Sequence, residues 1–576
     1  MRTVNKLRIL FVITALFVLG CTYFVTDHEK VVMDDLQIFG YMEEQEIPLS
    51  FWKGESDGKY YLFLPSMFSK NTNKEYAFRL EYEDKFYKVN VDDVMHRSGD
   101  VWTISSEEKE HHIRIRDPLG SAEEEYTFQI LCSEKLPAVM ITAEDLWEIE
   151  NPQLVSAQKY VEMGLVQVWN AEGNLVLDEE MEDFKVRGNI TRIMDKKPFT
   201  FTLNESASIL GMDEATKWIL LANATDGSYI RNKMILDMAD KATEDYVPKA
   251  EYVDLFLNGQ YRGMYLLTEA AEVGENRLQI DPNDSWFMEI DLDVRAPEQA
   301  HSFMTEQGQA IALHAEYAPD LEEQEELQEL VKRAERVIYN YEKKDTELSK
   351  VIDMDSWAFM WALQEISGNC DVGITSQFFY TKEKSEDAVL YAGPVWDFDA
   401  TMGNTYIALF RVPNALIASI EETRAEYSVN QNRWMSALYK HEAFQEAVIQ
   451  KYETVFLSII EEMLTSGIDS YVDFIDRSAE LDALRWHNQR LNWQYVLPEN
   501  LTIPVEGDYH RYNTIACNVD MVKKFLEQKR DFLNELWIAK TEFDIVEEEN
   551  TQIVLDSSAY RPGTYALNRI CRYRRT

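Results

Sequence analysis

Short runs of alternating apolar and polar residues fill the chain from about residue 34 to residue 133. Runs such as YYLFLP at 60–65 and HHIRIRDP at 111–118 are separated by Gly, Pro, Asn and Asp residues that favour turns. A strand with one buried face shows this alternation, because successive side chains point to opposite faces of the sheet. We therefore expect residues 30–134 to form a small, immunoglobulin-like β-sandwich.

A second region begins near residue 135, where Pro137 marks a seam, and it mixes strands with helices. The run VQVWNAEGNLVLDEEM predicts a hairpin around Glu172 and Gly173, and DFKVRGNITRIMDKKPFTFTLN predicts two strands joined by a basic connection. Asn258-Gly259 lies between two further alternating runs, which is the strongest short-range hairpin signal.

Helical spacing of apolar residues appears at several places in this second region. Trp218, Leu221 and Ala222, and then Ile230 and Met234, predict a pair of helices within residues 213–240. An acidic amphipathic helix is expected in 320–345 and an apolar core helix in 354–369. Several helical periods follow from about 430 to 536, and the tail, 541–576, is expected to be irregular. The fold class is therefore α+β, with the main domain at 135–540.

The first 29 residues have the charge pattern of an export signal. Arg2, Lys6 and Arg8 precede an apolar stretch from Ile9 to Val25, and acidic residues follow it. The sequence VLGC, ending at Cys21, resembles a bacterial lipoprotein cleavage box, although the next residues remain apolar. A signal anchor and a lipoprotein signal both stay open. Either predicts a protein exported and tethered to the outer face of the bacterial cell membrane.

The large excess of acidic residues limits which kinds of molecule the protein can bind. The chain has 576 residues, and 102 acidic residues outnumber 57 Lys and Arg, for a formal net charge of −45. No basic stripe with interleaved aromatic residues occurs after the N-terminus, so nucleic acid is not expected as a partner. A polyanionic substrate would need a local cluster of cations or a divalent metal ion to overcome this charge.

One such cluster lies in FKVRGNITRIMDKKPFTFTL. Arg187, Arg192, Lys196 and Lys197 place four positive charges within eleven residues, just before an apolar strand. These residues could hold phosphate. A solvated strand connection, whose lysines protect an edge from aggregation, explains the same pattern equally well.

Two single acids are further candidates. Glu269 ends a predicted strand, where it could pair with a lysine of a neighbouring strand or be an ordinary exposed acid. Asp371 follows the predicted core helix and precedes an aromatic strand, so we expect it on a loop. It could accept a proton from a hydroxyl nucleophile. Alternatively, Asn369 and Asp371 form local hydrogen bonds of a helix-ending turn.

The stretch AGPVWDFDATMGN supplies a pair of acids after an apolar run. Asp397 and Asp399 are one residue apart, and Gly403 allows the chain to turn. Mg²⁺ or Mn²⁺ prefers hard oxygen ligands and often takes one or two carboxylates together with substrate phosphates. A turn capped by two acids is an alternative explanation of the same pair. The basic segment, Glu269, Asp371 and a candidate metal ligand at Asp397 together suggest phosphoryl transfer. No glycine-rich nucleotide-binding loop is present in the sequence.

Five segments in this order resemble the CotH kinases, an atypical branch of the protein-kinase-like fold named for spore coat protein H. They lie within about residues 135–410 and are VRGNITR with DKKPFTFTL, WILLANATDGSYIRNKMILDMA, VDLFLNGQYRGMYLLTEAAEV, GNCDVGITSQFFY and GPVWDFDATMGN. The resemblance implies a two-lobed kinase-like domain that uses ATP and Mg²⁺ or Mn²⁺. It also implies that the protein phosphorylates Ser or Thr of exported or surface proteins, such as those of a spore coat.

The resemblance also implies roles for individual residues. Lys197, or less strongly Lys196, would be the nucleotide-phosphate lysine, with Glu269 as its ion-pair partner. Asp371 would be the catalytic-loop aspartate and Asp397 the metal-binding aspartate. The family usually places an asparagine about five residues after the catalytic aspartate, whereas here Gln377 follows six residues after Asp371 and would supply a carbonyl ligand on a longer arm.

Other functions fit parts of the sequence. DFDATM matches the DxDxT motif of haloacid-dehalogenase-type phosphatases, in which Asp397 would be the nucleophile and Asp399 the acid/base. DxD also occurs in glycosyltransferases that use nucleotide sugars. A kinase-like domain without turnover could serve as a surface-binding or adhesion module, an alternative favoured by the scarcity of ATP outside cells.

Overall fold

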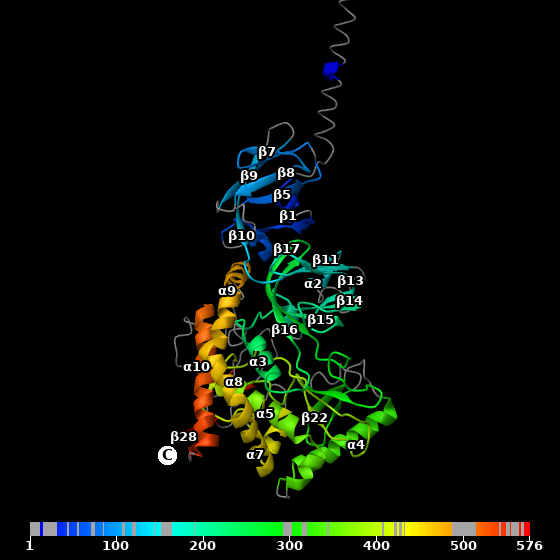
Figure 1. Ribbon diagram of the computed structural model, residues 1–576, viewed down its shortest axis with the longest axis vertical. Coiled ribbons are helices and arrows are strands. Elements are labelled where there is room, and N and C mark those ends of the chain that lie inside the picture. Colours follow the sequence, from blue (N-terminus) through cyan, green and yellow to red (C-terminus); the bar gives the residue numbers. More distant parts are fainter. Residues whose placement is uncertain are drawn as a thin grey trace, which may run out of the picture. The chain divides into compact units, whose positions relative to one another are not determined.

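The computed structural model describes residues 12–14, residues 31–540 with internal gaps, and short parts of 543–575 (Figure 1). The longest internal gaps are 151–163, 292–301 and 487–513. The chain forms two compact units. Unit 1 is Met1–Ser133 with Asn258–Tyr261, and unit 2 is Glu134–Leu257 with Arg262–Thr576. The fold is mixed α+β, as predicted.

Unit 1 contains two β-sheets with strand orders β2-β1-β5-β8 and β3-β4-β10-β9-β6-β7. Alternation produces these strands, since β5 buries Tyr76, Phe78 and Leu80 and turns the residues between them outward. The strands are β1 (Gln37–Met42), β2 (Gln45–Leu49), β3 (Phe51–Lys53), β4 (Tyr60–Leu64), β5 (Glu75–Glu81), β6 (Lys88–Val91), β7 (Val94–His96), β8 (Val101–Ser105), β9 (His111–Arg116) and β10 (Glu123–Cys132), with short helices η1 (Met33–Asp35) and η2 (Ser66–Lys70).

Unit 2 begins with a closed barrel of strand order β11-β12-β13-β14-β15-β17-β16. Its strands are β11 (Ala138–Ala143), β12 (Gly164–Trp169), β13 (Leu175–Val186), β14 (Phe199–Ala207), β15 (Ala215–Leu221), β16 (Ala250–Leu257) and β17 (Gln260–Glu269), with α2 (Leu146–Glu150) and η3 (Thr191–Ile193) in the connections. The interior is filled by apolar side chains that include Phe184, Phe201 and Trp218. Both predicted hairpins are confirmed, at Glu172-Gly173 between β12 and β13 and at Asn258-Gly259 between β16 and β17.

One of the two helices predicted within 213–240 is wrong. Ala215–Leu221 is strand β15, hydrogen-bonded between β14 and β17. Its run of buried residues from Trp218 to Leu220 fits helical spacing as well as a buried strand, and so short a run does not separate the two periods. The second helix is confirmed as α3 (Arg231–Asp240).

The remainder of unit 2 combines an antiparallel sheet of order β19-β20-β18-β21-β22 with helices. Its strands are β18 (Phe287–Asp291), β19 (Ser302–Met304), β20 (Ala310–Leu313), β21 (Gln377–Tyr380) and β22 (Tyr391–Ala392). The helices are α4 (Leu321–Ile338), η6 (Asp345–Lys350), α5 (Met354–Ser367), η7 (Ala408–Arg411), α6 (Arg433–Leu438), α7 (Glu442–Lys451), α8 (Leu457–Glu462), α9 (Ile468–Arg485) and α10 (Ile515–Leu533), with π-helical turns η8 (Tyr452–Phe456), η9 (Met463–Gly467) and η12 (Asn534–Ile538). The predicted amphipathic, core and C-terminal helices are thereby confirmed.

The tail beyond residue 541 differs from the expected irregular chain. It contains two short ladders, β25 (Phe543–Glu548) with β28 (Ile570–Arg575), and β26 (Ile553–Val554) with β27 (Thr564–Tyr565), besides the small pair β23 (Thr423–Arg424) and β24 (Val429–Asn430) earlier in the chain. The sequences FDIVEE and ICRYRR mix β-branched or aromatic residues with charged ones, a strand signal that the helical pattern upstream obscured.

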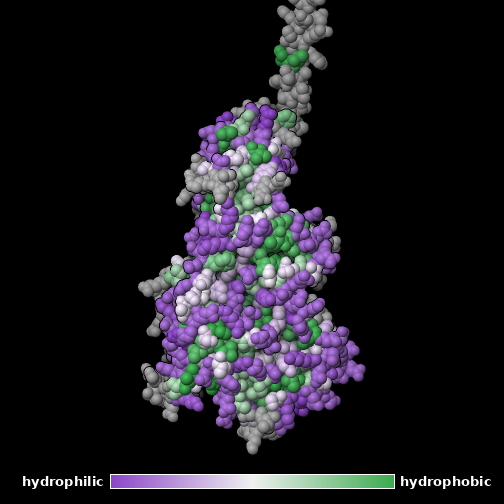
Figure 2. Space-filling model, in the orientation of Figure 1, coloured by the Kyte–Doolittle hydropathy of each residue, from purple (hydrophilic) through white to green (hydrophobic). Residues whose placement is uncertain are grey.

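Within the described part of the chain, no helix is both long enough and apolar enough to cross a bilayer. Of the apolar stretch Ile9–Val25, the structure describes only 12–14, so the predicted export segment lies almost wholly outside the described residues. The face shown in Figure 2 is covered mostly by hydrophilic residues, in keeping with the large excess of acids.

Candidate functional site

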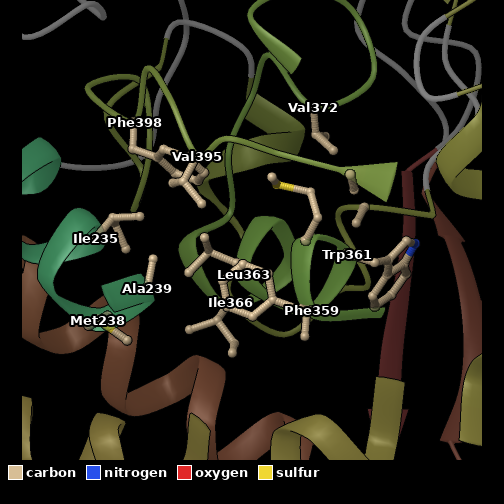
Figure 3. Close-up of a cluster of buried hydrophobic side chains, with 14 of the residues drawn as sticks. Ile235, Met238, Ala239, Phe359, Trp361, Leu363, Ile366, Val372, Val395 and Phe398 are labelled. Carbon is tan, nitrogen blue, oxygen red and sulfur yellow. The ribbon is translucent and has the colours of Figure 1, made fainter. Parts of the chain in front are cut away.

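The Asp371 loop begins where the core helix α5 ends. Gly368 caps the helix in the left-handed conformation, with φ of 60°, and the Asn369 side chain then accepts a hydrogen bond from the Asp371 amide at 3.0 Å. Asp371 is half-buried on the loop, and the neighbouring Val372 is buried in the apolar core around α3 and α5 (Figure 3). The predicted loop position of Asp371 is confirmed, and local turn bonding by Asn369 is present as well.

The Asp397 segment follows the edge strand β22. Val395 and Phe398 anchor it in the same apolar core (Figure 3). Asp397 between them is exposed. Asp397 has a left-handed backbone, with φ of 66°, and the next amide, of Phe398, donates to the Asn232 side chain at 2.7 Å. A non-glycine residue in this region costs of the order of 1 kcal/mol and persists only where the surroundings hold it.

Hydrogen bonds join these two segments directly. The Cys370 amide donates to the Ala400 carbonyl at 3.2 Å, and the Met402 amide donates to the Ser367 carbonyl at 2.7 Å. At the acids themselves, the Ser376 hydroxyl donates to Asp397 Oδ2 at 3.0 Å. The loop that carries Asp371 and the segment that carries Asp397 therefore lie side by side, as the predicted site requires.

Ser376, which the sequence did not single out, contacts Asp397, whereas its neighbour Gln377 does not point there. The Gln377 side chain is buried, where its Oε1 accepts from the Gly373 amide at 3.1 Å and its Nε2 lies 3.5 Å from the Met435 sulfur. Gln377 opens strand β21, whereas Ser376 just before it has a left-handed backbone, with φ of 57°, so strand alternation does not extend to Ser376. The predicted use of Gln377 as a metal ligand is thus not favoured by its contacts. The signal available in the sequence was the position of Ser376, five residues after Asp371.

Arg187 provides a cation at the same place. Its guanidinium lies 5.3 Å from the ring of Trp396, and its backbone amide donates to the Pro198 carbonyl at the start of β14. Burial lowers the pKa of Arg187, and the negative charges of Asp397 and Glu289 oppose that shift. Glu289 in turn accepts from the Ser376 amide at 3.2 Å. Arg187, Glu289 and Asp397 therefore form one charged cluster, and Ser376 joins the two acids by hydrogen bonds.

The predicted pair of Lys197 and Glu269 is wrong. Strand β15 lies between β14 and β17 in the barrel, so the strands that adjoin these two residues are separated by about 9–10 Å, or two strand spacings. The Lys197 ammonium donates to the carbonyls of Arg192 and Met194 at 3.1 and 2.7 Å. Glu269 is buried and pairs with Arg277 at 3.1 Å; burial raises its pKa and Arg277 opposes that rise.

Lys196 has the lysine–acid pair that was expected of Lys197. Its ammonium lies 2.6 Å from Asp482 Oδ1 of α9 and donates to the Met264 carbonyl at 2.7 Å, and both charged side chains are buried. Burial lowers the pKa of Lys196, while Asp482 opposes that shift. Three polar contacts with the barrel recur every four residues along this part of the chain, at Ser478, Asp482 and Trp486. The Ser478 hydroxyl donates a hydrogen bond to Asp254, and the Trp486 ring N–H donates to the Arg262 carbonyl. This four-residue spacing of polar side chains is the sequence pattern that could have predicted a contact between α9 and the barrel.

The segment between β15 and α3 supports Asp399 and was also missed. The Thr225 hydroxyl donates to Asp399 Oδ2 at 2.7 Å, so Asp399 holds a loop rather than standing open beside Asp397. Asp226 pairs with Arg231, whose Nε donates to the Thr401 carbonyl at 3.0 Å. The signal in the sequence was Arg231 three residues before the apolar run Met234–Leu236, because an arginine buried beside such a run requires a partner.

An aromatic surface lies next to Asp397 along the chain. Tyr391 and Trp396 are partly buried against a cluster formed by Leu278, Phe287, Phe378 and Tyr380. Tyr380 and Tyr391 are stacked with ring centroids 5.4 Å apart, and the Lys382 ammonium lies 4.0 Å from the centre of the Tyr391 ring. Such a surface suits a planar ligand.

A family model described as CotH kinase protein matches residues 184–533. The match covers more than half of the chain. The chain therefore belongs to the CotH kinase protein family. No curated protein matches it. Among solved structures, a putative glycoside hydrolase from Bacteroides thetaiotaomicron has 11% sequence identity over 52% of this chain and 88% of that chain, with a TM-score of 0.13, too low to support any argument.

The CotH match contains every candidate residue described above, from Arg187 to Asp482, and does not extend to residues 1–183 or 534–576. Among the described residues of this CotH protein, no three or more His, Cys, Asp or Glu side chains gather into a metal cluster. Mg²⁺ does not require one, because it often retains several waters and binds one or two carboxylates together with substrate phosphates.

Proposed function

We propose that this CotH family member is an ATP-dependent protein kinase that phosphorylates Ser or Thr of exported or cell-surface proteins, including those of a spore coat. The observation that carries the proposal is the contact between Ser376 and Asp397, which joins the Asp371 loop to the metal-type acid beside the charge of Arg187. Positioning and electrostatic stabilisation are the main requirements for phosphoryl transfer.

The residues described above have separate roles in this proposal. Asp371 would accept the proton of the substrate hydroxyl, and Arg187 would offset the charge of the phosphates. Asp397 would hold Mg²⁺ or Mn²⁺, and its carboxylate suits a hard cation because it is exposed and only Oδ2 accepts from Ser376. The metal ion, when bound, would neutralise the charge of the ATP phosphates. The aromatic surface with Tyr391 and Trp396 would receive the nucleotide base.

The kinase-like two-lobed arrangement is part of the same proposal. The barrel, which supplies Arg187 and Lys196, would form one lobe, and the helices with the antiparallel sheet, which supply Asp371 and Asp397, the other. We further propose that residues 1–29 act as a signal anchor or lipoprotein signal, which would place unit 2 outside the bacterial cell membrane. Membrane and protein substrate would then be its partners.

The second candidate is a surface-binding protein that retains the family fold without turnover. It is favoured by the lysines, since Lys196 is bound to Asp482 and Lys197 to backbone carbonyls, so the ammonium groups of both are occupied within the protein. The phosphatase alternative has less support. Its motif belongs on the first strand of a doubly wound parallel sheet, whereas Asp397 follows the edge strand of an antiparallel one.

The test is phosphoryl transfer from γ-labelled ATP by the full-length chain, purified in mild detergent, to itself or to a Ser/Thr-rich protein. We expect Asp397→Ala and Asp371→Ala each to reduce transfer by about 100-fold or more. Asp387→Ala is the matched control, because that side chain is 97% exposed, and it should retain activity. Nucleotide binding without any transfer by the wild type would support the surface-binding alternative.

A further inference from the structure

Phe525 lies on the C-terminal helix α10. Its ring packs against the loop that carries Asp371 and against the segment that carries Asp397 and Asp399. A Cβ atom placed on Gly368, which ends α5 three residues before Asp371, would lie 2.5 Å from the Phe525 ring. A Cβ atom on Gly403, four residues after Asp399, would lie 3.8 Å from the same ring. Both glycines have left-handed backbones, with φ of 60° and 79°. The ring therefore fills the space where the two loops come together.

A buried ion pair fixes helix α10 at Lys529, one helical turn after Phe525 and on the same face of the helix. The Lys529 ammonium lies 2.6 Å from Glu365 Oε1 of α5, and both side chains are fully buried. Lys529 also donates to the Ala415 carbonyl at 2.7 Å, while Glu365 Oε2 accepts from the Ala418 amide at 2.7 Å. A buried ion pair with its remaining hydrogen bonds satisfied defines a single relative placement of the elements that it joins. This pair sets the position at which Phe525 meets the loops.

We propose that Phe525 is a positioning residue for the phosphoryl transfer of this protein, an inference that rests on the proposed function. The two loops are joined by the bonds from Cys370 to Ala400 and from Met402 to Ser367, both on the backbone. Those two bonds fix where the Asp371 loop and the Asp397 segment touch. The Phe525 ring packs behind them and limits how far Asp371 can move relative to the contact between Ser376 and Asp397. Small errors of placement at reacting groups reduce rates strongly.

The test compares two phenylalanines of one helix in the full-length chain. Phe525 and Phe532 are 4% and 5% exposed, so truncating either should lower the melting temperature to a similar extent. At a temperature where both variants are folded, we expect Phe525→Ala to lower kcat by about 10-fold or more and to raise the Mg²⁺ concentration for half-maximal transfer, with KM for ATP little changed. Phe532→Ala should leave these quantities near the wild-type values.

A rescue experiment covers the case in which Phe525→Ala fails to fold. Gly368→Ala would push a methyl group against the ring and should lower kcat, and Phe525→Leu in the same chain should recover part of that loss. Equal effects of the two phenylalanine variants on kcat, or a double variant no more active than the product of the single effects, would overturn the inference while leaving the kinase proposal intact. A wild type that transfers no phosphate would overturn both.

Discussion

At the scale of single residues, the candidate site is marked by backbone that most residues avoid. Ser376, Asp397 and Met402 all have positive φ, of 57°, 66° and 48°. Each is held by a specific bond, such as the one from the Met402 amide to Ser367. Such conformations persist where packing and hydrogen bonds outweigh their cost, and they concentrate at functional sites. The geometry around Asp397 is therefore built into the fold before any ligand arrives.

The contact of Ser376 with Asp397 leads to a first prediction. Ser376→Ala should raise the Mg²⁺ concentration needed for half-maximal phosphoryl transfer by about 10-fold, because groups that orient a metal ligand typically change metal affinity by that amount or more. The measurement is transfer from labelled ATP over a Mg²⁺ titration.

Gln377→Met is the matched control for that titration. It should leave the Mg²⁺ dependence unchanged and lower the free energy of unfolding by about 1 kcal/mol, because the Gly373 amide loses its acceptor. If Gln377→Met changed the metal dependence and Ser376→Ala did not, the assignment of these two neighbours would be reversed.

A second prediction concerns the buried pair of Lys196 and Asp482. Asp482→Ala should lower the free energy of unfolding by about 3–5 kcal/mol, because it leaves a buried ammonium without its partner. The double variant Lys196→Met with Asp482→Leu should be clearly more stable than Asp482→Ala alone. Urea denaturation of the three proteins measures this. Equal stability of the single and double variants would mean that the ammonium finds water or another partner.

At the scale of elements, patterns that are long or flanked by clear turn residues were interpreted correctly. The hairpins at Gly173 and Gly259 were predictable because only a few residue types tolerate the backbone of tight turns. Helix α5 was predictable from its apolar run Trp357–Leu363, and the structure buries every residue from Ser356 to Ser367. Strand β15 was missed because its pairing with β14 and β17, rather than its own period, determines its conformation.

A third prediction tests the hairpin between β12 and β13. Gly173 has φ of 91°, and its amide donates to the Asn170 carbonyl at 3.1 Å. Gly173→Val should lower the free energy of unfolding by about 1–2 kcal/mol, since a β-branched residue is strained there. Glu172→Ala, at the exposed neighbour, is the control and should change it by less than about 0.5 kcal/mol. Thermal denaturation followed by circular dichroism would show whether the two variants differ.

At the scale of the whole molecule, the net charge of −45 sets the conditions for binding any anion. The face visible in Figure 2 is largely hydrophilic. Charges farther than about 10 Å from an approaching nucleotide are the ones that salt screens most at ordinary ionic strength. The attraction between Arg187 and a bound phosphate is less sensitive to salt, because the Arg187 side chain is half-buried.

A fourth prediction follows for the rate at which Mg²⁺-bound ATP associates. Between about 20 mM and about 200 mM salt, the association rate constant should rise, the reverse of the behaviour of an electrostatically steered ligand. Stopped-flow fluorescence with a labelled nucleotide analogue measures it. A rate that falls with salt would show that the local cations dominate the field at the entrance.

The sequence by itself determined the succession of strand-rich and helix-rich segments, the two tight hairpins, the family, and the presence of Asp371 and Asp397 on segments that follow ordered elements. These depend on local periods and turn chemistry, which act over a few residues. Only the tertiary structure decided which charged groups meet. Lys196 pairs with Asp482 because α9 packs against the barrel, and Ser376 reaches Asp397 because backbone hydrogen bonds hold their two loops side by side. Glu269 likewise pairs with Arg277 rather than with a lysine of a neighbouring strand.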